Sequence, residues 1–334
     1  MLKQVHFAGI KSLLDVTVDL ERFTVLVGPN GCGKSTVLDQ IEAVCEMTVP
    51  EPGASEVLGK AQRVLTAIRP DEIRTSGTDA VMRWRVGSEE AGEYFETVIA
   101  PASTAKAHKG WVDRCTVAAL AENRTYRLAT NGTTPAAKAE IEAVLIRQFS
   151  LRSQRLRLTP GAVAADSPIA STRIEPNGEG TPTVLMKLAV NDPDAFRQVK
   201  LDMTKVVPQF QSLRIDTRKG TDGRGNPVDV VCLSLQMLGA GMVPANSVSD
   251  GTLLALALLT ATHNRDLPAL ILMDDIDHGL HLSAQFQIIE AIRRVMKVRE
   301  DLQVICTTHA PVLVDSFEPS EVRVMALNKA GRSL

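Results

Sequence analysis

Residues 28–36 constrain the fold of this chain more than any other stretch. They are Gly28, Pro29, Asn30, Gly31, Cys32, Gly33, Lys34, Ser35 and Thr36, and they match G-x-x-x-x-G-K-[ST] at every fixed position. Glycines allow the backbone to curl so that successive N–H groups face inward and form a concave site for an anion. In this pattern Lys34 reaches the β- and γ-phosphates of a nucleotide and Ser35 offers its hydroxyl to Mg²⁺. The stretch therefore predicts a phosphate loop that binds ATP with Mg²⁺.

The residues on either side of the loop supply the context that this motif requires. Residues 22–27 form an apolar, β-branched run that is typical of a buried strand. Residues 36–44 carry apolar side chains at helical spacing, so a helix should follow the loop and point its positive end at the phosphates. The alternative is a glycine-rich turn that binds nothing, but the strand and the helix favour the phosphate loop.

Composition and charge add few further limits. The chain has 334 residues and a net charge of −2, which gives no overall attraction to nucleic acid or to a membrane surface. Its five cysteines form no C-x-x-C pair, which argues against a disulfide framework or a zinc site and fits a reducing cytosol. The N-terminus does not read as a signal peptide, and the apolar run 253–261 is about half the roughly 20 residues needed to span a bilayer. We therefore expect a cytoplasmic protein without a membrane partner.

Hydrophobic patterning predicts one module, residues 1–334, with four parts. They are a phosphate-loop lobe (1–50), an antiparallel β-subdomain (57–130), an insertion of helices and a hairpin (135–246) and a lobe of alternating strands and helices (247–334). Strands that alternate with helices imply a largely parallel sheet with right-handed crossovers. The expected fold class is α/β, of the P-loop NTPase type.

Two predicted buried strands end in polar residues. The strand 269–273 is followed by Asp274 and Asp275, and the strand 303–306 leads through two threonines to His309. Ligands of open α/β sheets bind at the carboxyl ends of the strands. We expect Asp274 to hold Mg²⁺, Asp275 to orient or deprotonate the attacking water, and His309 to contact the γ-phosphate. The alternatives are a solvated turn for the two acids and a structural role for the histidine.

A predicted helix begins at residues 249–252, which read Ser-Asp-Gly-Thr. Serine is a common helix N-cap, and this is the simpler interpretation. A helix N-terminus that carries Ser249 and Gly251 is also suited to an anion.

Taken together, these motifs resemble the ABC-type ATPases, and within them the RecF/SMC-like branch of bacterial ATPases that includes OLD-like proteins. The resemblance rests on residues 7–12 with 28–36, residues 248–252, residues 272–281 and residues 307–311. It implies an ABC-ATPase head with a helical signature subdomain, which hydrolyses ATP to ADP and phosphate. It also implies a head-to-tail homodimer with composite sites, in which Ser249 and Gly251 of one subunit contact the γ-phosphate held by the other. Such a protein would act as a switch that controls a separate effector in antiviral defence or DNA repair.

The sequence departs from this family in three places. Asp275 stands where the family usually has glutamate, and a water held about 1 Å off can cost about 100-fold in rate, so we expect slow hydrolysis. Asp250 stands where transporter ATPases have glycine. The glutamine loop of the family has two candidates, Gln40 and Gln154.

Two other functions remain open. A DNA-binding, RecF-like repair ATPase is suggested by two basic runs, for which solvated helix and strand faces are the alternative. The runs are Arg147, Arg152, Arg155 and Arg157, and Arg293, Arg294, Lys297 and Arg299. An ABC transporter subunit is the third possibility, and the motif at 249–252 and the RecF-like N-terminus both disfavour it.

Overall fold

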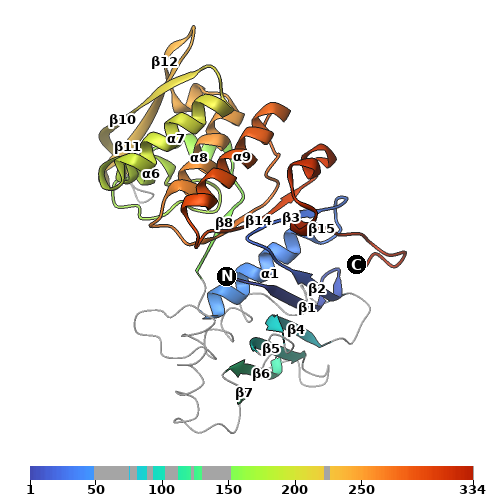
Figure 1. Cartoon of the computed structure of the whole chain (residues 1–334). Coiled ribbons are helices and arrows are strands. Elements are labelled where there is room, and N and C mark those ends of the chain that lie inside the picture. The colour runs from blue at the N-terminus through green and yellow to red at the C-terminus, as the bar shows by residue number, and fades with distance from the viewer. Residues whose placement is uncertain are drawn as a thin grey trace. The chain divides into compact units, whose positions relative to one another are not determined.

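The computed structural model describes most of the chain in two compact units (Figure 1). The described residues are 1–48, 75, 81–88, 93–101, 112–121, 124–129, 152–221 and 226–333. The first unit contains Met1–Ser153, Val304–His309 and Glu318–Leu334, and the second contains Gln154–Gln303 and Ala310–Phe317. The expected strand at 63–68, the expected loop at 102–110 and the expected helix at 135–151 lie outside the described residues, as does Arg147.

The first unit contains a six-stranded antiparallel sheet in the order β2-β1-β4-β5-β6-β7. Its strands are β1 (Gln4–Ile10), β2 (Leu13–Asp19), β4 (Met82–Ser88), β5 (Glu93–Pro101), β6 (Val112–Ala121) and β7 (Arg124–Ala129). Phe7 of β1 pairs with Val16 of β2 and Trp84 of β4, and all three side chains are buried on one face. The predicted N-terminal hairpin and the predicted antiparallel meander therefore exist, and the pairing of β1 with β4 joins them into one sheet.

Three parallel strands carry the phosphate loop in the first unit. β3 (Phe23–Val27) lies between β14 (Gln303–Thr308) and β15 (Val322–Val324), and Val27 is in register with both Thr308 and Val324. The loop after β3 leads into α1 (Lys34–Thr48), which contacts β1 and β4. Because β3 and β14 run parallel and end in register, the phosphate loop and the residue after Thr308 lie at the same sheet edge.

The second unit packs four helices together (Figure 1). They are α6 (Thr181–Asn191), α7 (Pro193–Val206), α8 (Asp250–His263) and α9 (Leu282–Val298). Every residue of α8 from Thr252 to Thr262 is buried, so this helix is enclosed on all sides, as its continuous apolar sequence predicts. α9 is amphipathic instead. The spacing of Phe286, Ile289, Ile292 and Met296 predicts one apolar stripe, of which Ile289, Ile292 and Met296 are buried and Phe286 is half-buried.

Strands complete the second unit. β10 (Phe210–Thr221) and β11 (Pro227–Met237) form the predicted hairpin, and β12 (Gly241–Pro244) and β9 (Ser167–Pro168) pair with β11. β13 (Leu270–Met273) lies beside β8 (Ser153–Leu156). At the end of the two strands the N–H of Asp274 donates to the carbonyl of Leu156 at 3.0 Å. Short 3-10 helices connect the larger elements: η2 (Ala245–Ser247) and η3 (Pro311–Ser316) in this unit, and η4 (Pro319–Glu321) in the first unit.

Two predicted boundaries were wrong. Residues 161–180 read as a loop, but they contribute most of the short helix α5 (Pro160–Ala164) and strand β9. A strand was expected over 321–327, whereas β15 ends at Val324. The peptide after Val324 still bonds to β3, where the Met325 N–H donates to the Val27 carbonyl at 2.7 Å, and its carbonyl then turns toward Gly28.

Candidate functional site

The glycines of the phosphate loop are required by the backbone and by close packing. Gly31 and Gly33 have φ values of 78° and 97°, in the left-handed region that favours glycine. A Cβ atom on Gly28 would clash with the carbonyl oxygen of Met325, and one on Gly33 would lie 2.7 Å from the Ser333 hydroxyl oxygen. The loop therefore has the left-handed turns and tight backbone approach from which an anion nest is built.

Lys34 is the centre of this loop. Its Nζ donates to the carbonyl oxygens of Gly28 at 2.8 Å and Pro29 at 3.0 Å, and lies 3.2 Å from Nδ1 of His309. The lysine is only 4 % exposed. Because an ammonium group can only donate, Nδ1 must be the acceptor, which places the imidazole proton on Nε2. The structure thus brings together two residues that the sequence predicts for one site, at the ends of neighbouring parallel strands.

These residues fit a nucleotide's phosphates. The ammonium of Lys34 is held by two neutral carbonyls and an imidazole, which an anionic phosphate can replace with a stronger charge-assisted bond. Pro29, Asn30 and Gly31 are exposed, so the loop is open to solvent on that side. Ser35 lies in the first turn of α1, and its hydroxyl is a hard oxygen donor of the kind that Mg²⁺ prefers.

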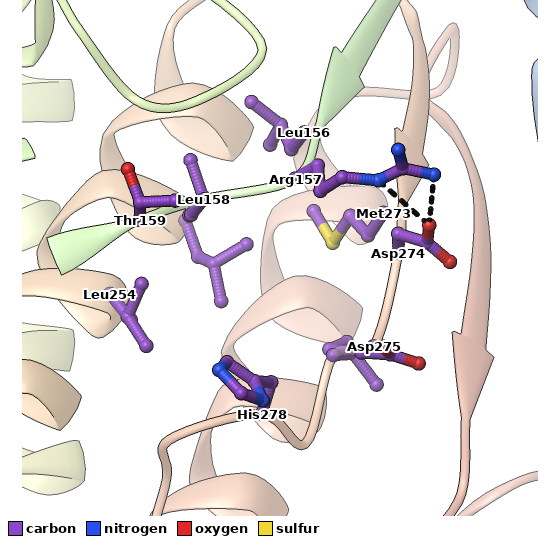
Figure 2. A pocket seen from close by; sticks show the side chains of 11 residues that line it. Leu156, Arg157, Leu158, Thr159, Leu254, Met273, Asp274, Asp275 and His278 are labelled. Atoms are coloured by element: carbon purple, nitrogen blue, oxygen red, sulfur yellow. Dashed lines mark hydrogen bonds and ion pairs between the residues drawn. The ribbon is translucent and has the colours of Figure 1, made fainter. Parts of the chain in front are cut away.

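In the second unit, Asp274 is held by two arginines, Arg155 and Arg157, and Figure 2 shows its contact with Arg157. Its Oδ2 accepts hydrogen bonds from Nη2 of Arg155 at 3.0 Å and from Nε and Nη2 of Arg157 at 3.1 and 2.8 Å. The side chains of Asp274 and Arg155 are 5 % and 4 % exposed, whereas that of Arg157 is 60 % exposed. The carboxylate has the chemistry of a Mg²⁺ ligand, but the arginines compete for it. The sequence assigned both arginines to a basic run for DNA, and the structure instead pairs them with this acid.

Asp275 has a backbone conformation that accounts for its identity. Its φ is 49°, in the left-handed region where aspartate and asparagine are several-fold enriched over other non-glycine residues. Its carbonyl accepts from the N–H of His278 at 2.9 Å, which closes a turn after β13. A longer acid such as glutamate is less suited to this conformation, so the departure from the family pattern has a local structural reason.

A pocket of about 270 Å³ lies beside the two acids in the second unit (Figure 2). Its apolar wall comes from Leu156, Leu254 and Met273, and Arg157 and His278 line its polar part. Leu254 belongs to α8, so the pocket links the start of that helix to the residues that follow β13.

Ser249 and Gly251 open helix α8. Ser249 is the N-cap residue, but its hydroxyl oxygen lies 2.8 Å from that of Thr252 and makes no capping bond to the backbone. A Cβ atom on Gly251 would lie 2.8 Å from the carbonyl oxygen of Gly279. Glycine is therefore required at position 251 by packing within one subunit, against the loop that follows the two acids.

The second basic run also has partners inside the second unit. Three of its arginines bind other residues: Arg294 to Asp202 at 2.6 Å, Arg299 to the carbonyls of Thr262 and Asn264, and Arg293 to the carbonyl of Ser316. Asp202 also lies 3.0 Å from Nε2 of His263. These side chains join α7, α8 and α9, so the run is mainly a set of helix-to-helix contacts.

Both candidates for the glutamine loop are buried and bonded internally. Gln40 accepts from the indole N–H of Trp84 at 2.7 Å, and Gln154 donates to the carbonyl of Ile174 at 2.8 Å. Neither geometry indicates a role at the phosphates. Cys32, Cys45, Cys232 and Cys306 take part in no disulfide bond, and no group of three or more potential metal-binding His, Cys, Asp or Glu side chains occurs among the side chains that the structure describes.

Comparisons with known proteins bear on the fold of the chain. Residues 189–315 match the family described as an AAA domain, putative AbiEii toxin, of a type IV toxin–antitoxin system. An Smc head bound to the C-winged helix domain of ScpA is 15 % identical, with a TM-score of 0.56 over 99 % of this chain and 96 % of that one. The Smc head of Pyrococcus furiosus, bound to the C-terminal domain of ScpA, is 12 % identical, with a TM-score of 0.51 over 99 % and 94 %. No curated protein sequence matches significantly. The chain has the fold of an SMC head, and its predicted resemblance to ABC-type ATPases of the RecF/SMC-like kind is confirmed.

Proposed function

We propose that this chain binds and hydrolyses ATP, dimerises when ATP is bound, and acts as a switch that controls a partner in bacterial defence or DNA repair. The observation that carries the proposal is the pairing of Lys34 with His309 at the mouth of the phosphate loop. A lysine on a glycine loop, beside a histidine from the next parallel strand, is suited to bind a γ-phosphate and to respond to its loss.

Each predicted site residue has a role in this proposal. Lys34 leaves the loop carbonyls and Nδ1 of His309 for the phosphates, and the N–H of the His309 imidazole would donate to the γ-phosphate. Ser35 and Asp274 would hold Mg²⁺, which would neutralise charge on the phosphates when bound. Asp275 orients the attacking water and accepts its proton.

The proposed dimer is head to tail. Ser249 and Gly251 of one subunit would face the γ-phosphate held by Lys34 of the other, with α8 directing its positive end at that phosphate. The likeness to Smc heads that bind ScpA domains supports a protein partner, and the match to an AbiEii-type AAA domain supports a place in defence. Hydrolysis would then separate the subunits and release the partner.

Three measurements test the proposal. Calorimetry should show ATP binding to the parent chain and a loss of binding in Lys34→Ala. Phosphate release should slow by about 100-fold or more in Asp275→Asn, which keeps the shape of the side chain. Light scattering should show that this variant forms ATP-dependent dimers. A parent chain that binds no ATP would contradict the enzyme assignment, and a monomer in saturating ATP would contradict the switch.

A DNA-binding repair ATPase is the second candidate. Five of the arginines that favoured it in the sequence are bonded within the second unit, which weakens the argument: Arg155, Arg157, Arg293, Arg294 and Arg299. Titration of duplex DNA at several salt concentrations separates the two functions, because phosphate contacts give a linear fall of log affinity with log salt. No helix in the described ranges is long and apolar enough to cross a membrane.

A further inference from the structure

Residues 325–333, here called the C-terminal segment, lie against the phosphate loop at two places. At one, the Met325 N–H donates to the Val27 carbonyl at 2.7 Å and its own carbonyl packs over Gly28. At the other, Ser333 lies over Cys32 and Gly33. The segment therefore contacts the loop near its beginning and near its end.

A tight turn fixes Ser333 in place. Asn328 organises this turn: its N–H donates to the carbonyl of Arg332 at 2.8 Å, and its side-chain oxygen accepts from the N–H groups of Ala330 at 2.9 Å and Arg332 at 3.0 Å. Leu327 and Ser333 then form an antiparallel bridge. Because the turn is bonded internally, the position of Ser333 is set before any ligand arrives.

Ser333 connects two parts of the loop's surroundings. Its hydroxyl oxygen lies 2.8 Å from the carbonyl oxygen of Cys32 and 2.8 Å from the hydroxyl oxygen of Ser12, and its N–H donates to the Ser12 carbonyl at 2.8 Å. The Ser333 hydroxyl is the donor in both contacts, so its single proton is shared between the carbonyl of Cys32 and the hydroxyl oxygen of Ser12. Ser333 is 4 % exposed, so water does not easily take its place.

This bond fixes the orientation of one peptide unit. In a trans peptide the C=O of Cys32 and the N–H of Gly33 point in opposite directions, and no described peptide is cis. When Ser333 holds the carbonyl on one side, the Gly33 N–H points to the other side. Without that bond, the glycine at φ 97° has the freedom to let this peptide rotate.

We propose that Ser333 is a positioning residue for the phosphate loop, which holds the Cys32–Gly33 peptide so that the Gly33 N–H faces the bound phosphates. The inference rests on the proposed function, because it assumes that the loop binds a nucleotide. When the N–H is already oriented, nucleotide binding loses less conformational entropy in the loop. Ser333 therefore strengthens binding without contacting the ligand.

The test compares Ser333→Thr with Ser333→Val. These side chains have the same shape, and only threonine keeps the hydroxyl. The affinities for ADP and ATP are measured by calorimetry in EDTA, which prevents hydrolysis, and KM and kcat are then measured with Mg²⁺. The valine variant should bind about 3- to 10-fold more weakly than the threonine variant, the range that one net hydrogen bond allows. It should raise KM with kcat unchanged, the signature of lost ground-state binding.

Controls separate positioning from stability and from the proposed function. Melting midpoints of both variants are measured without nucleotide, and Ser320→Ala, at an exposed serine of the same unit, should match the parent. Equal ATP affinity in the threonine and valine variants would overturn the inference while the parent still binds ATP. A parent chain that binds no ATP would overturn the proposed function itself.

A second variant covers the case in which Ser333→Val does not fold. Ser12→Ala removes the acceptor that competes with Cys32 for the Ser333 proton, at a partly exposed turn, and should tighten ATP binding by a small factor. In the double variant with Ser333→Val this gain should disappear, because it acts through the same bond to Cys32. An affinity equal to or weaker than that of the parent in Ser12→Ala, or the same gain in the Ser333→Val background, would contradict the proposal.

Discussion

The left-handed conformation of Asp275 allows its backbone and its carboxylate to be tested separately. Four substitutions do this: Asp275→Asn, Asp275→Gly, Asp275→Ala and Asp275→Glu. Asparagine keeps the shape and the tolerance of a φ of 49° but cannot accept the proton from water, whereas glycine frees the backbone altogether. Alanine removes the carboxylate and adds strain, so alanine alone would confuse a structural effect with a catalytic one.

The expected magnitudes follow from this conformation. A non-glycine residue in the left-handed region costs about 1–2 kcal/mol, and aspartate and asparagine recover part of this by local hydrogen bonding. We expect Asp275→Ala to be about 1 kcal/mol less stable than Asp275→Gly, with Asp275→Asn close to the parent. We expect Asp275→Glu to be destabilised by about the same amount as the alanine variant, since it also lacks the local bond of the shorter side chain.

Urea unfolding and phosphate release measure the two effects. If Asp275 accepts the proton of the attacking water, Asp275→Asn should fold like the parent and hydrolyse ATP about 100-fold or more slowly. An alanine variant as stable as the glycine variant would refute the backbone reasoning. An asparagine variant that hydrolyses at the parent rate would refute the assignment of the base, whatever the stabilities are.

Two further predictions concern the second unit. Burial raises the pKa of the Asp202 carboxyl, but hydrogen bonds and charges from His263 and Arg294 outweigh it and lower the pKa from 3.8 to about 2. The ionised carboxylate therefore stabilises the folded state by about 2 kcal/mol above about pH 4, and this stabilisation is lost as the pH falls toward 2. Urea unfolding at several pH values should show this loss in the parent and not in Asp202→Asn. Gly251→Ala would place a Cβ atom 2.8 Å from a backbone carbonyl oxygen and should lower the free energy of unfolding by about 1–3 kcal/mol. A Cβ atom at Gly161 meets nothing within 4 Å, so Gly161→Ala should not lower it by this amount. Equal stabilities of the two variants would contradict the packing argument.

The sequence was sufficient for the parts of the site that depend on local backbone requirements. The phosphate loop could be predicted because its glycines and Lys34 must occur at fixed spacing to curl around an anion. The pairing of Lys34 with His309 was also accessible, since both follow buried parallel strands whose carboxyl ends share one edge. The roles assigned to Asp275 and Ser249 remain predictions, because their ligands are a water and a second subunit.

Other features depend on contacts between residues far apart in the chain. Ser333 lies 301 positions from Cys32 in a segment with no motif, so nothing in the sequence distinguishes it from other serines. Arg155 and Arg157 are basic residues at alternate positions, a pattern that is equally typical of a solvated strand. Their common partner appears only when β8 and β13 lie side by side. Short elements such as β12, with four residues, were missed because so few residues establish no periodicity.

The two arginines on Asp274 have different exposures, which would let the metal-binding role proposed for this side chain coexist with a structural one. Arg155 is buried, so its guanidinium has lost its contact with water and needs a charge partner in the protein. Its bond to Asp274 therefore contributes to the stability of the fold. Arg157 is largely exposed, so water can take up its guanidinium when it leaves. A divalent cation at Asp274 would repel both guanidinium groups, and the exposed one is the cheaper to displace. The structure thus distinguishes a permanent partner of Asp274 from an exchangeable one, a difference that the spacing of two arginines in a sequence does not contain.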